Sequence, residues 1–337
     1  MFTCIWFRSS LCYLFLLPFS WLYGLVSTLN RISYQHGWRK VYRFSVPIVI
    51  IGNITIGGNG KTPMVLWLVE QLQYRGWKVG VVSRGYKGKS KHYPIVININ
   101  TNSNECGDEP MLIWRRTGVL VAVSPKRSDA VAALLRIQEE LDIIISDDGL
   151  QHYALFRDIE WVVVNSLFRF GNGCWLPAGP MRERMNRLHT VQAVIVNGSK
   201  EDRLAGEVLM QLYPSTVINM LTGESRSLNC LSNVVAIAGI GYPTQFFGTL
   251  KNYGVTPIRT ISFSDHQIYY ERMLTSLTKK NEILLMTEKD AVKCLDFARN
   301  NWWYVRMEVK INKIDTDNLL CAVEDKIRYY KDYNSNI

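Results

Sequence analysis

The feature that most constrains how this chain can fold is a glycine-rich turn between a β-branched run and a periodic apolar segment. The run is Val46–Ile51, and the apolar positions of Met64–Leu72 recur with the period of a helix. Main-chain N–H groups that point together at a phosphate need residues without a Cβ in such a turn. Strand, turn and helix in this order predict the phosphate loop of a nucleoside triphosphate site. The residues expected to cradle the phosphates are Thr55, Ile56, Gly57, Gly58, Asn59, Gly60, Lys61 and Thr62.

Two side chains of this loop have expected roles of their own. Lys61 is expected to reach the β and γ phosphates of ATP, and the Thr62 hydroxyl is expected to hold Mg²⁺. Thr55 stands where the usual G-x-x-x-x-G-K-[ST] pattern has its first glycine. The alternative is a structural turn that contains Gly-Lys-Thr by chance, and the flanking strand and helix favour the phosphate loop.

The rest of the chain reads as α/β. It has 337 residues, 47% of them hydrophobic, which is enough for two packed domains. Near-continuous Val/Ile runs alternate with helix-length polar segments, which indicates a parallel sheet covered on both faces. The expected division is an N-terminal membrane-associated segment over residues 1–40, a phosphate-loop α/β domain over 41–215, a linker over 216–233, and a smaller α/β domain over 234–337.

The N-terminal segment is expected to associate with a membrane as a helix. Residues Ser9–Asn30 carry no charge, basic residues flank them, and the first acidic residue is Glu70. The length suits either a bilayer span or an interfacial helix rich in aromatic residues, and both readings stay open. A cleaved secretory signal is disfavoured because no small-residue cleavage site follows Val26. A buried core helix is disfavoured because aromatic and basic residues adjoin as they do at lipid headgroups.

The net charge and the cysteines indicate in which compartment the protein works and which kinds of partner it binds. The net charge of +10 gathers beside the apolar N-terminus, so we expect attraction to anionic lipid rather than to nucleic acid. The seven cysteines form no C-x-x-C pair, which indicates reduced thiols and a cytoplasmic catalytic body. No obligate protein partner is inferred.

Two adjacent carboxylates, Asp147 and Asp148, follow the apolar run Leu141–Ser146. Ligands of open α/β sheets bind at the carboxyl ends of the strands, and paired acids there suit Mg²⁺. The alternative is that Asp148-Gly149 is a turn that ends the strand. Two neighbouring acids without a cation between them and the phosphates are costly, which favours the metal.

A further acidic pair and one histidine are candidates for proton transfer. Asp108 and Glu109 precede Pro110, which by itself is typical of a helix start, and Asp265-His266 by itself suits a capping acid beside a surface histidine. Phosphoryl transfer to a hydroxyl benefits from a base, and an aspartate ordered by a histidine is a plausible pair for that task.

Cations and a long loop complete the candidates. Arg84, Arg127 and His152 follow strand ends or the acidic pair, and strand ends of one sheet meet at one rim, so they can face an anionic substrate or nucleotide. The alternative is a solvated charged face.

The segment Gly171–Glu183 is too rich in glycine and proline for a regular element, and it is either an ordinary surface loop or a functional one.

Together these motifs resemble the tetraacyldisaccharide 4′-kinase family, the lipid A kinases of Gram-negative bacteria. The resemblance spans nearly the whole chain, and the altered loop that begins at Thr55 is itself typical of the family. It rests on Gly52–Pro63, Ser83–Tyr86, Gly107–Pro110, Asp147–His152, Leu176–Glu183 and Phe263–His266.

The resemblance implies transfer of the ATP γ-phosphate to the 4′-hydroxyl of a tetraacylated glucosamine disaccharide 1-phosphate, giving lipid IV-A at the cytoplasmic face of the inner membrane. It implies that Asp108 is the catalytic base, that His266 orders it from the second domain on closure, and that Asp147 and Asp148 serve Mg²⁺. Glu109 is a further metal candidate, and Arg84, Arg127 and His152 match positions of the family's site.

Two departures from the family pattern, Arg184 and Leu150, adjoin the motifs and bear on local substrate contacts. The alternative function is a membrane-associated phosphate-loop ATPase or nucleotide switch that acts on a protein partner.

Overall fold

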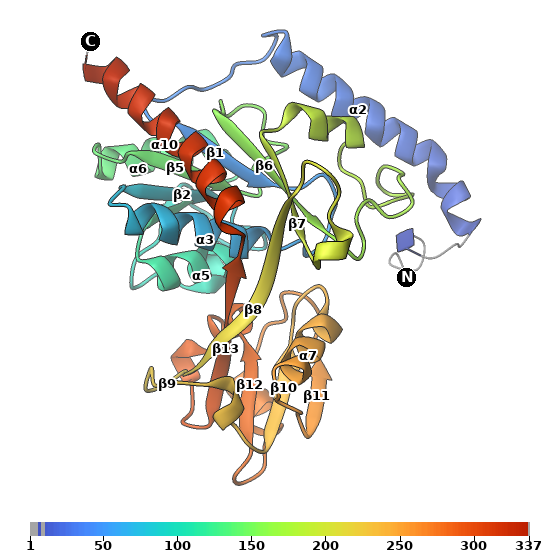
Figure 1. The fold of residues 1–337 in the computed structure, drawn as a ribbon, viewed down its shortest axis with the longest axis vertical. Coiled ribbons are helices and arrows are strands. Elements are labelled where there is room, and N and C mark those ends of the chain that lie inside the picture. The colour runs from blue at the N-terminus through green and yellow to red at the C-terminus, as the bar shows by residue number, and fades with distance from the viewer. Residues whose placement is uncertain (1–5, 8–10, 336–337) are drawn as a thin grey trace. The chain divides into compact units, whose positions relative to one another are not determined.

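The computed structural model describes residues 6–7 and 11–335, and it divides into two compact units (Figure 1). Unit 1 comprises Met1–Arg84, Lys126–Gln211 and Ile311–Ile337, and unit 2 comprises Gly85–Pro125 and Leu212–Lys310. Each unit is therefore assembled from separate stretches of chain. The contiguous ranges expected from the sequence remain a prediction, since these units follow spatial contacts rather than chain order.

Unit 1 is built on a parallel sheet with the strand order β2-β5-β1-β6-β7-β8. Every residue of its first four strands is buried, which is why they read as continuous apolar runs. The register places Ile51 of β1 beside Asp147 of β5. The predicted parallel α/β sheet is thus confirmed. The strands are β1 Ile48–Gly52, β2 Val79–Ser83, β5 Ile143–Asp147, β6 Ile159–Asn165, β7 Ala193–Asn197 and β8 Val208–Asn219.

Helices cover this sheet. Helix α3, Lys61–Tyr74, contacts β1, β2 and β5, and α6, Arg127–Ile137, contacts β2. The C-terminal helix α10, Lys313–Ser335, joins the same unit: Glu324 accepts hydrogen bonds from Arg75 and from the Trp77 indole at 3.3 and 3.1 Å. Short 3-10 helices η2, Met185–Thr190, and η3, Lys200–Asp202, lie in its connections.

The N-terminal part of unit 1 is a 3-10 helix η1, Leu11–Leu16, followed by helix α2, Leu17–Gln35 (Figure 1). Helix α2 buries the small residues Ser20 and Gly24 and exposes its large apolar residues. This is the inverse of a helix that packs its apolar face on a core. In the part of the chain that the structure describes, no helix has the length and hydrophobicity that crossing a bilayer requires.

Unit 2 contains a second parallel sheet with the order β11-β10-β12-β13, and the end of β8 continues it beside β13. Its two faces carry separate apolar clusters, one around Phe246 and Trp303 and the other around Tyr269 and Trp302. The strands are β9 Ser225–Arg226, β10 Val234–Ala238, β11 Arg259–Ser262, β12 Ile283–Thr287 and β13 Trp302–Lys310, with β3 Ile95–Val96 antiparallel to β4 Leu120–Val123. The helices are α4 Ser103–Cys106, α5 Asp108–Thr117, η4 Leu228–Cys230, α7 Pro243–Asn252, α8 Glu271–Thr275, α9 Glu288–Ala291 and η5 Leu295–Phe297.

A buried arginine fixes α5 to the neighbouring elements of unit 2. The Arg116 side chain is 3% exposed and pairs with Glu288 of α9 at 3.1 Å and with Glu308 of β13 at 2.9 Å. It also donates a hydrogen bond to the Met307 carbonyl oxygen at 2.7 Å. Burial raises the pKa of Glu288, and Arg116 opposes that rise. Arg116 therefore ties α5 to α9 and β13 by charge, in addition to the buried apolar residues of the helix.

Two elements do not follow the expected division of the chain. Strand β8 runs through residue 215, where the first domain was expected to end, and reaches into the stretch expected to be a linker. The C-terminal helix α10 falls in unit 1, although its residues lie in the range 234–337 of the expected smaller domain.

Candidate functional site

The glycine-rich turn joins β1 to α3 in unit 1, as the sequence predicts. Gly57 and Gly60 have φ angles of 114° and 97°, which side chains with a Cβ rarely adopt. A Cβ on Gly60 would also lie 2.8 Å from the Asn197 side-chain nitrogen and 2.9 Å from the Met210 methyl carbon. Only glycine fits this position. The turn ends at the N-terminus of α3, where the first N–H groups have no partner within the helix.

Thr55 has a structural reason to replace the usual first glycine. Its hydroxyl accepts a hydrogen bond from the buried Asn59 side chain at 3.0 Å, which braces the loop across four residues. Thr55 also forms an antiparallel bridge with Met181. Thr55 therefore lacks the conformational freedom of a glycine, but its hydroxyl forms a hydrogen bond that stabilises the turn.

The paired acids lie at the carboxyl end of β5, next to β1. Asp147 is buried and accepts a hydrogen bond from Ser83 at 3.4 Å. Asp148 has a positive φ of 46° and lies 3.6 Å from the Lys61 ammonium group. Burial by itself raises the pKa of Asp148, but Lys61 and Arg182 outweigh burial and lower it to about 2. Asp148 is therefore ionised at any physiological pH.

Arg127 and His152 form a chain of hydrogen bonds that reaches the main chain of the acidic pair. The buried Arg127 guanidinium donates to the carbonyl oxygens of Asp147 and Asp148 at 3.4 and 2.8 Å. His152 Nε2 accepts the Arg127 main-chain N–H at 3.2 Å, and burial with nearby arginines lowers its pKa to about 4. Arg127 thus contacts the backbone of both acids and His152 contacts the backbone of Arg127, whereas Arg84 is exposed at the end of β2.

The loop Gly171–Arg184, here called the strap, runs alongside the glycine-rich turn. The Ile56 N–H donates to the Pro180 carbonyl oxygen at 2.9 Å, and the Arg182 N–H donates to the Ile54 carbonyl oxygen at 2.7 Å. The Arg182 guanidinium donates to both Asp148 carboxylate oxygens at 3.1 and 3.2 Å. The sequence marked this loop as a candidate but did not single out Arg182.

The other side of the strap is joined to α2. A Cβ on Gly24 would lie 2.2 Å from the Trp175 ring, so the indole fills the space that a side chain would need. Ser20 donates a hydrogen bond to the Trp175 carbonyl oxygen at 2.6 Å. The Arg184 guanidinium lies 3.8 Å from the Trp175 ring centre. Arg184, one of the two departures from the family pattern, therefore stacks on this ring.

Unit 2 brings together the other predicted residues. Asp108 and Glu109 form the first turn of α5, as the sequence predicts, and His266 lies in the turn after β11. His266 Nδ1 is 2.9 Å from Asp108 Oδ2, although the residues are 158 positions apart. Because both residues belong to one compact unit, the expectation that domain closure brings them together is wrong.

A lysine that sequence reasoning missed completes this cluster. Lys289 of α9 lies 2.6 Å from Glu109 Oε1 and 3.2 Å from Asp265 Oδ1. Lys293, one helical turn later, lies 2.8 Å from Asp290, which is fully buried. In the sequence these lysines look like an ordinary charged helix surface, so no local pattern distinguishes them.

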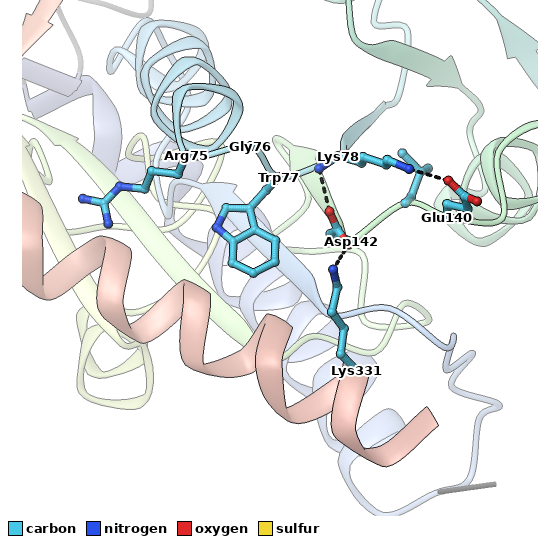
Figure 2. A pocket seen from close by; sticks show the side chains of 8 residues that line it. Arg75, Gly76, Trp77, Lys78, Glu140, Asp142 and Lys331 are labelled. Atoms are coloured by element: carbon cyan, nitrogen blue, oxygen red, sulfur yellow. Dashed lines mark hydrogen bonds and ion pairs between the residues drawn. The ribbon is translucent and has the colours of Figure 1, made fainter. Parts of the chain in front are cut away.

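Unit 1 also has a polar cavity that none of the predicted site residues lines (Figure 2). Lys78 and Asp142 line it and directly precede β2 and β5, so it lies at the amino ends of the strands. Figure 2 shows Lys78 paired with Glu140, and Lys331 of α10 reaching Asp142 at 2.6 Å. Because its charges pair with one another, we read it as the seam between α10 and the sheet rather than as a ligand site.

The comparisons with known proteins agree with the geometry. The family described as tetraacyldisaccharide-1-P 4'-kinase matches residues 12–327. The tetraacyldisaccharide 4'-kinase of Blochmanniella pennsylvanica (strain BPEN) is 78% identical over 337 residues, which is 100% of both chains. That of Blochmanniella floridana is 70% identical over 327 residues, covering 97% of this chain and 98% of the relative.

Among solved structures, the crystal structure of LpxK from Aquifex aeolicus in complex with ATP matches with a TM-score of 0.77 at 28% identity. The match covers 94% of this chain and 99% of that one. The family match extends over nearly the whole chain and is joined by relatives of high identity, so this chain belongs to the tetraacyldisaccharide-1-P 4'-kinase family.

Proposed function

We propose that this family member transfers the γ-phosphoryl group of ATP to the 4′-hydroxyl of a tetraacylated glucosamine disaccharide 1-phosphate, giving lipid IV-A in lipid A biosynthesis. The observation that carries the proposal is the strand, glycine turn and helix of unit 1, with Lys61 3.6 Å from Asp148. Relatives that are 70–78% identical bear the name of this kinase. An ATP-bound structure of LpxK from Aquifex aeolicus supports the nucleotide.

The residues Thr55–Thr62 are proposed to hold the triphosphate. The left-handed glycines Gly57 and Gly60 let the main chain approach phosphate oxygens, and the N-terminus of α3 adds the positive end of its dipole. Lys61 is proposed to neutralise the β and γ phosphates. Lys61 pairs with Asp148 in this structure, so we infer that Lys61 moves from Asp148 toward the phosphates when the nucleotide binds.

Mg²⁺ fits the donor set of unit 1. Thr62, Asp147 and Asp148 offer one hydroxyl and two carboxylates, and Mg²⁺ typically takes one or two carboxylates together with substrate phosphates and water. No cluster of three or more acids, histidines or cysteines with metal geometry occurs among the residues that the structure describes, consistent with a site that phosphates complete. When bound, Mg²⁺ supplies charge neutralisation at the transferring group. Glu109 remains a proposed further ligand, and it would have to exchange its contact with Lys289.

Asp108 is proposed to be the base. A carboxylate oxygen of Asp108 accepts the proton of the 4′-hydroxyl. The hydroxyl oxygen forms its bond to the γ-phosphorus as the bond from that phosphorus to ADP breaks. The His266 contact at 2.9 Å orients the carboxylate. Arg84 is proposed to contact an anionic substrate or nucleotide group directly. Arg127 is proposed to act through the carbonyl oxygens of Asp147 and Asp148, and His152 is proposed to act through the Arg127 main chain that it contacts.

Helix α2 is proposed to lie in the surface of the inner membrane, at its cytoplasmic face, where the acylated substrate resides. Its exposed side carries Phe19, Trp21, Leu22, Leu25, Val26 and Leu29, and Phe15 of η1 precedes them, each of these residues being more than half exposed. Arg31 lies in the last turns of α2, and Arg39, Lys40 and Arg43 follow the helix; such residues are attracted to anionic headgroups. An apolar face of this size beside a basic cluster fits a lipid surface better than water.

The proposal is tested by incubating the full chain with Mg²⁺, labelled ATP and a tetraacyl disaccharide 1-phosphate in mixed micelles, and then locating the new phosphate on the sugar. We expect label at the 4′ position with the native chain. With Asp108→Ala we expect transfer to fall by about 10²-fold or more while ATP binding is retained. An Asp108→Ala variant that hydrolyses ATP normally, or a native chain that labels no lipid, would instead support the nucleotide switch.

A further inference from the structure

Asn197, the last residue of β7, is hydrogen-bonded to the glycine-rich turn of unit 1. Its side-chain Nδ2 donates to the Asn59 carbonyl oxygen at 3.4 Å, although the two residues are 138 positions apart and β6 lies between β7 and β1 in the sheet. Asn197 and Asn59 are only 7% and 5% exposed. With the amide turned the other way, Oδ1 would face a carbonyl oxygen, and two acceptors repel each other. The donor orientation is therefore the favourable one.

This hydrogen bond determines which way the Gly60 N–H points. The Asn59 carbonyl and the Gly60 N–H belong to one trans peptide group, in which the two bonds point in opposite directions. A carbonyl held toward Asn197 therefore holds the N–H away from Asn197. Glycine adopts positive and negative φ about equally well, so Gly60 by itself does not fix this peptide in the orientation that its φ of 97° gives. The orientation has to come from a contact outside the turn.

Asn197 itself is held firmly by the sheet. It pairs in register with Asn165 of β6 on one side and with Met210 of β8 on the other. Its carbonyl oxygen accepts the N–H of Ser166 at 3.0 Å. The Asn197 amide nitrogen and the Met210 methyl carbon also occupy the space beside Gly60, where a Cβ would lie 2.8 and 2.9 Å from them. A side chain anchored in this way can impose its geometry on the adjoining turn.

We propose that Asn197 is a positioning residue that holds the Asn59–Gly60 peptide in the orientation that receives a phosphate oxygen, before the nucleotide arrives. The inference deepens the proposed function and rests on residues Thr55–Thr62 as the triphosphate site. The Asn59 side chain is already tied to Thr55 at 3.0 Å, and Asn197 supplies the second tie, at the carbonyl. The turn is then fixed on both sides of Asn59.

A positioning role of this kind affects nucleotide affinity more than the rate of transfer. The apparent Kd equals the intrinsic Kd divided by the fraction of molecules whose turn is competent to bind, so a fraction that falls to about one tenth raises Kd about tenfold. Bound phosphates hold the Gly60 N–H themselves, so the turn is expected to regain its geometry at saturating ATP. The loss of Asn197 should therefore raise KM for ATP and change kcat little.

Asn197→Leu tests the proposal in the full chain, because leucine keeps the branched shape and removes the donor. Calorimetric titration measures Kd for ATP with Mg²⁺ and for inorganic tripolyphosphate, and competition with a fluorescent ATP analogue extends the range to weak binding. We expect both Kd values to rise by a similar factor, roughly 5- to 30-fold, because the lost contact acts on the phosphates. KM for ATP should rise likewise, with kcat within about threefold of the native value. Asn197→Ala replaces the leucine variant should that one fail to fold.

Asn219→Leu is the matched control. Asn219 is a buried asparagine at the end of β8 that donates to the Asn300 carbonyl oxygen at 2.7 Å, and we expect neither Kd to change. An unchanged Kd in Asn197→Leu, or an equal rise in Asn219→Leu, overturns the proposal. So does a rise for ATP without one for tripolyphosphate, since Asn197 would then act on the nucleoside. A native chain that binds neither ligand defeats the proposed triphosphate site, whereas native binding that Asn197→Leu leaves unchanged defeats the positioning role alone.

Discussion

Replacing Arg116 tests whether the cation that fixes α5 is as important as its burial implies. In Arg116→Met the aliphatic stem stays, but Glu288 loses its 3.1 Å partner while its side chain remains only 13% exposed. Glu308 keeps Arg306 at 3.0 Å, so the cost falls mainly on Glu288. Breaking one side of a buried pair typically costs about 3–5 kcal/mol, and we expect about 3 kcal/mol here.

The loss should depend on pH with a defined sign. Burial already raises the pKa of Glu288, and Arg116 opposes the rise, so Arg116→Met raises it further. Between the unfolded pKa and the higher folded pKa, the folded variant holds a proton that the unfolded chain has already released, so its stability falls as pH rises through the folded pKa and then levels off. Arg116→Met should therefore be closer to the native chain in stability at pH 5 than at pH 8.

Urea unfolding followed by circular dichroism at pH 5 and pH 8 measures both effects, and hydrogen exchange of peptides covering α5 and α9 locates them. The double variant Arg116→Met with Glu288→Gln should recover about half of the loss or more, since the buried charge is gone. Arg299→Met is the control. Arg299 pairs with Glu271 at 2.8 Å with about half of each side chain exposed, and such pairs contribute about 0–1 kcal/mol. A loss below about 1 kcal/mol for Arg116→Met, or one that is equal at both pH values, refutes the reasoning.

Three further outcomes are expected. Gly60→Ala should weaken ATP binding about tenfold or more by equilibrium titration, because a Cβ meets atoms at 2.8 and 2.9 Å, whereas Gly76→Ala, equally left-handed with open space around it, should bind normally. The double variant Phe19→Ser with Leu22→Ser should lose sedimentation with anionic vesicles while keeping nucleotide-dependent thermal stabilisation; unchanged sedimentation contradicts the docking of α2. His152→Gln should flatten the fall in stability between about pH 6.5 and pH 4, because the folded pKa of His152 is about 4 and acid protonates the unfolded state first; an unaltered acid profile contradicts this.

Local patterns made much of unit 1 predictable. The turn, the buried strands and the acids after β5 follow from residue type and order, because parallel strands place their carboxyl ends at one edge. Strand β8 escaped prediction because its buried positions recur about every third residue and Pro214 interrupts it, so neither alternation nor a continuous apolar run is present.

The long-range contacts of the site could not be read from spacing. Asp108 and His266 come together because α5 packs in the unit that contains β11; the need for an oriented base and the family resemblance suggested the pair, but no local spacing did. Arg182 and Lys289 were missed because arginine and lysine in polar segments usually face water. Their partners, Asp148 and Glu109, are fixed by packing far along the chain.

The joint between Gly24 and Trp175 limits how the N-terminal helix can be exchanged. A generic hydrophobic anchor grafted in place of α2 would supply the apolar surface that the proposed membrane attachment needs, yet any side chain at position 24 would collide with the indole and push on the strap that runs beside the glycine-rich turn. Engineering of this chain onto another surface therefore has to preserve the glycine at position 24, because the proposed membrane contact and the proposed nucleotide site are linked through it.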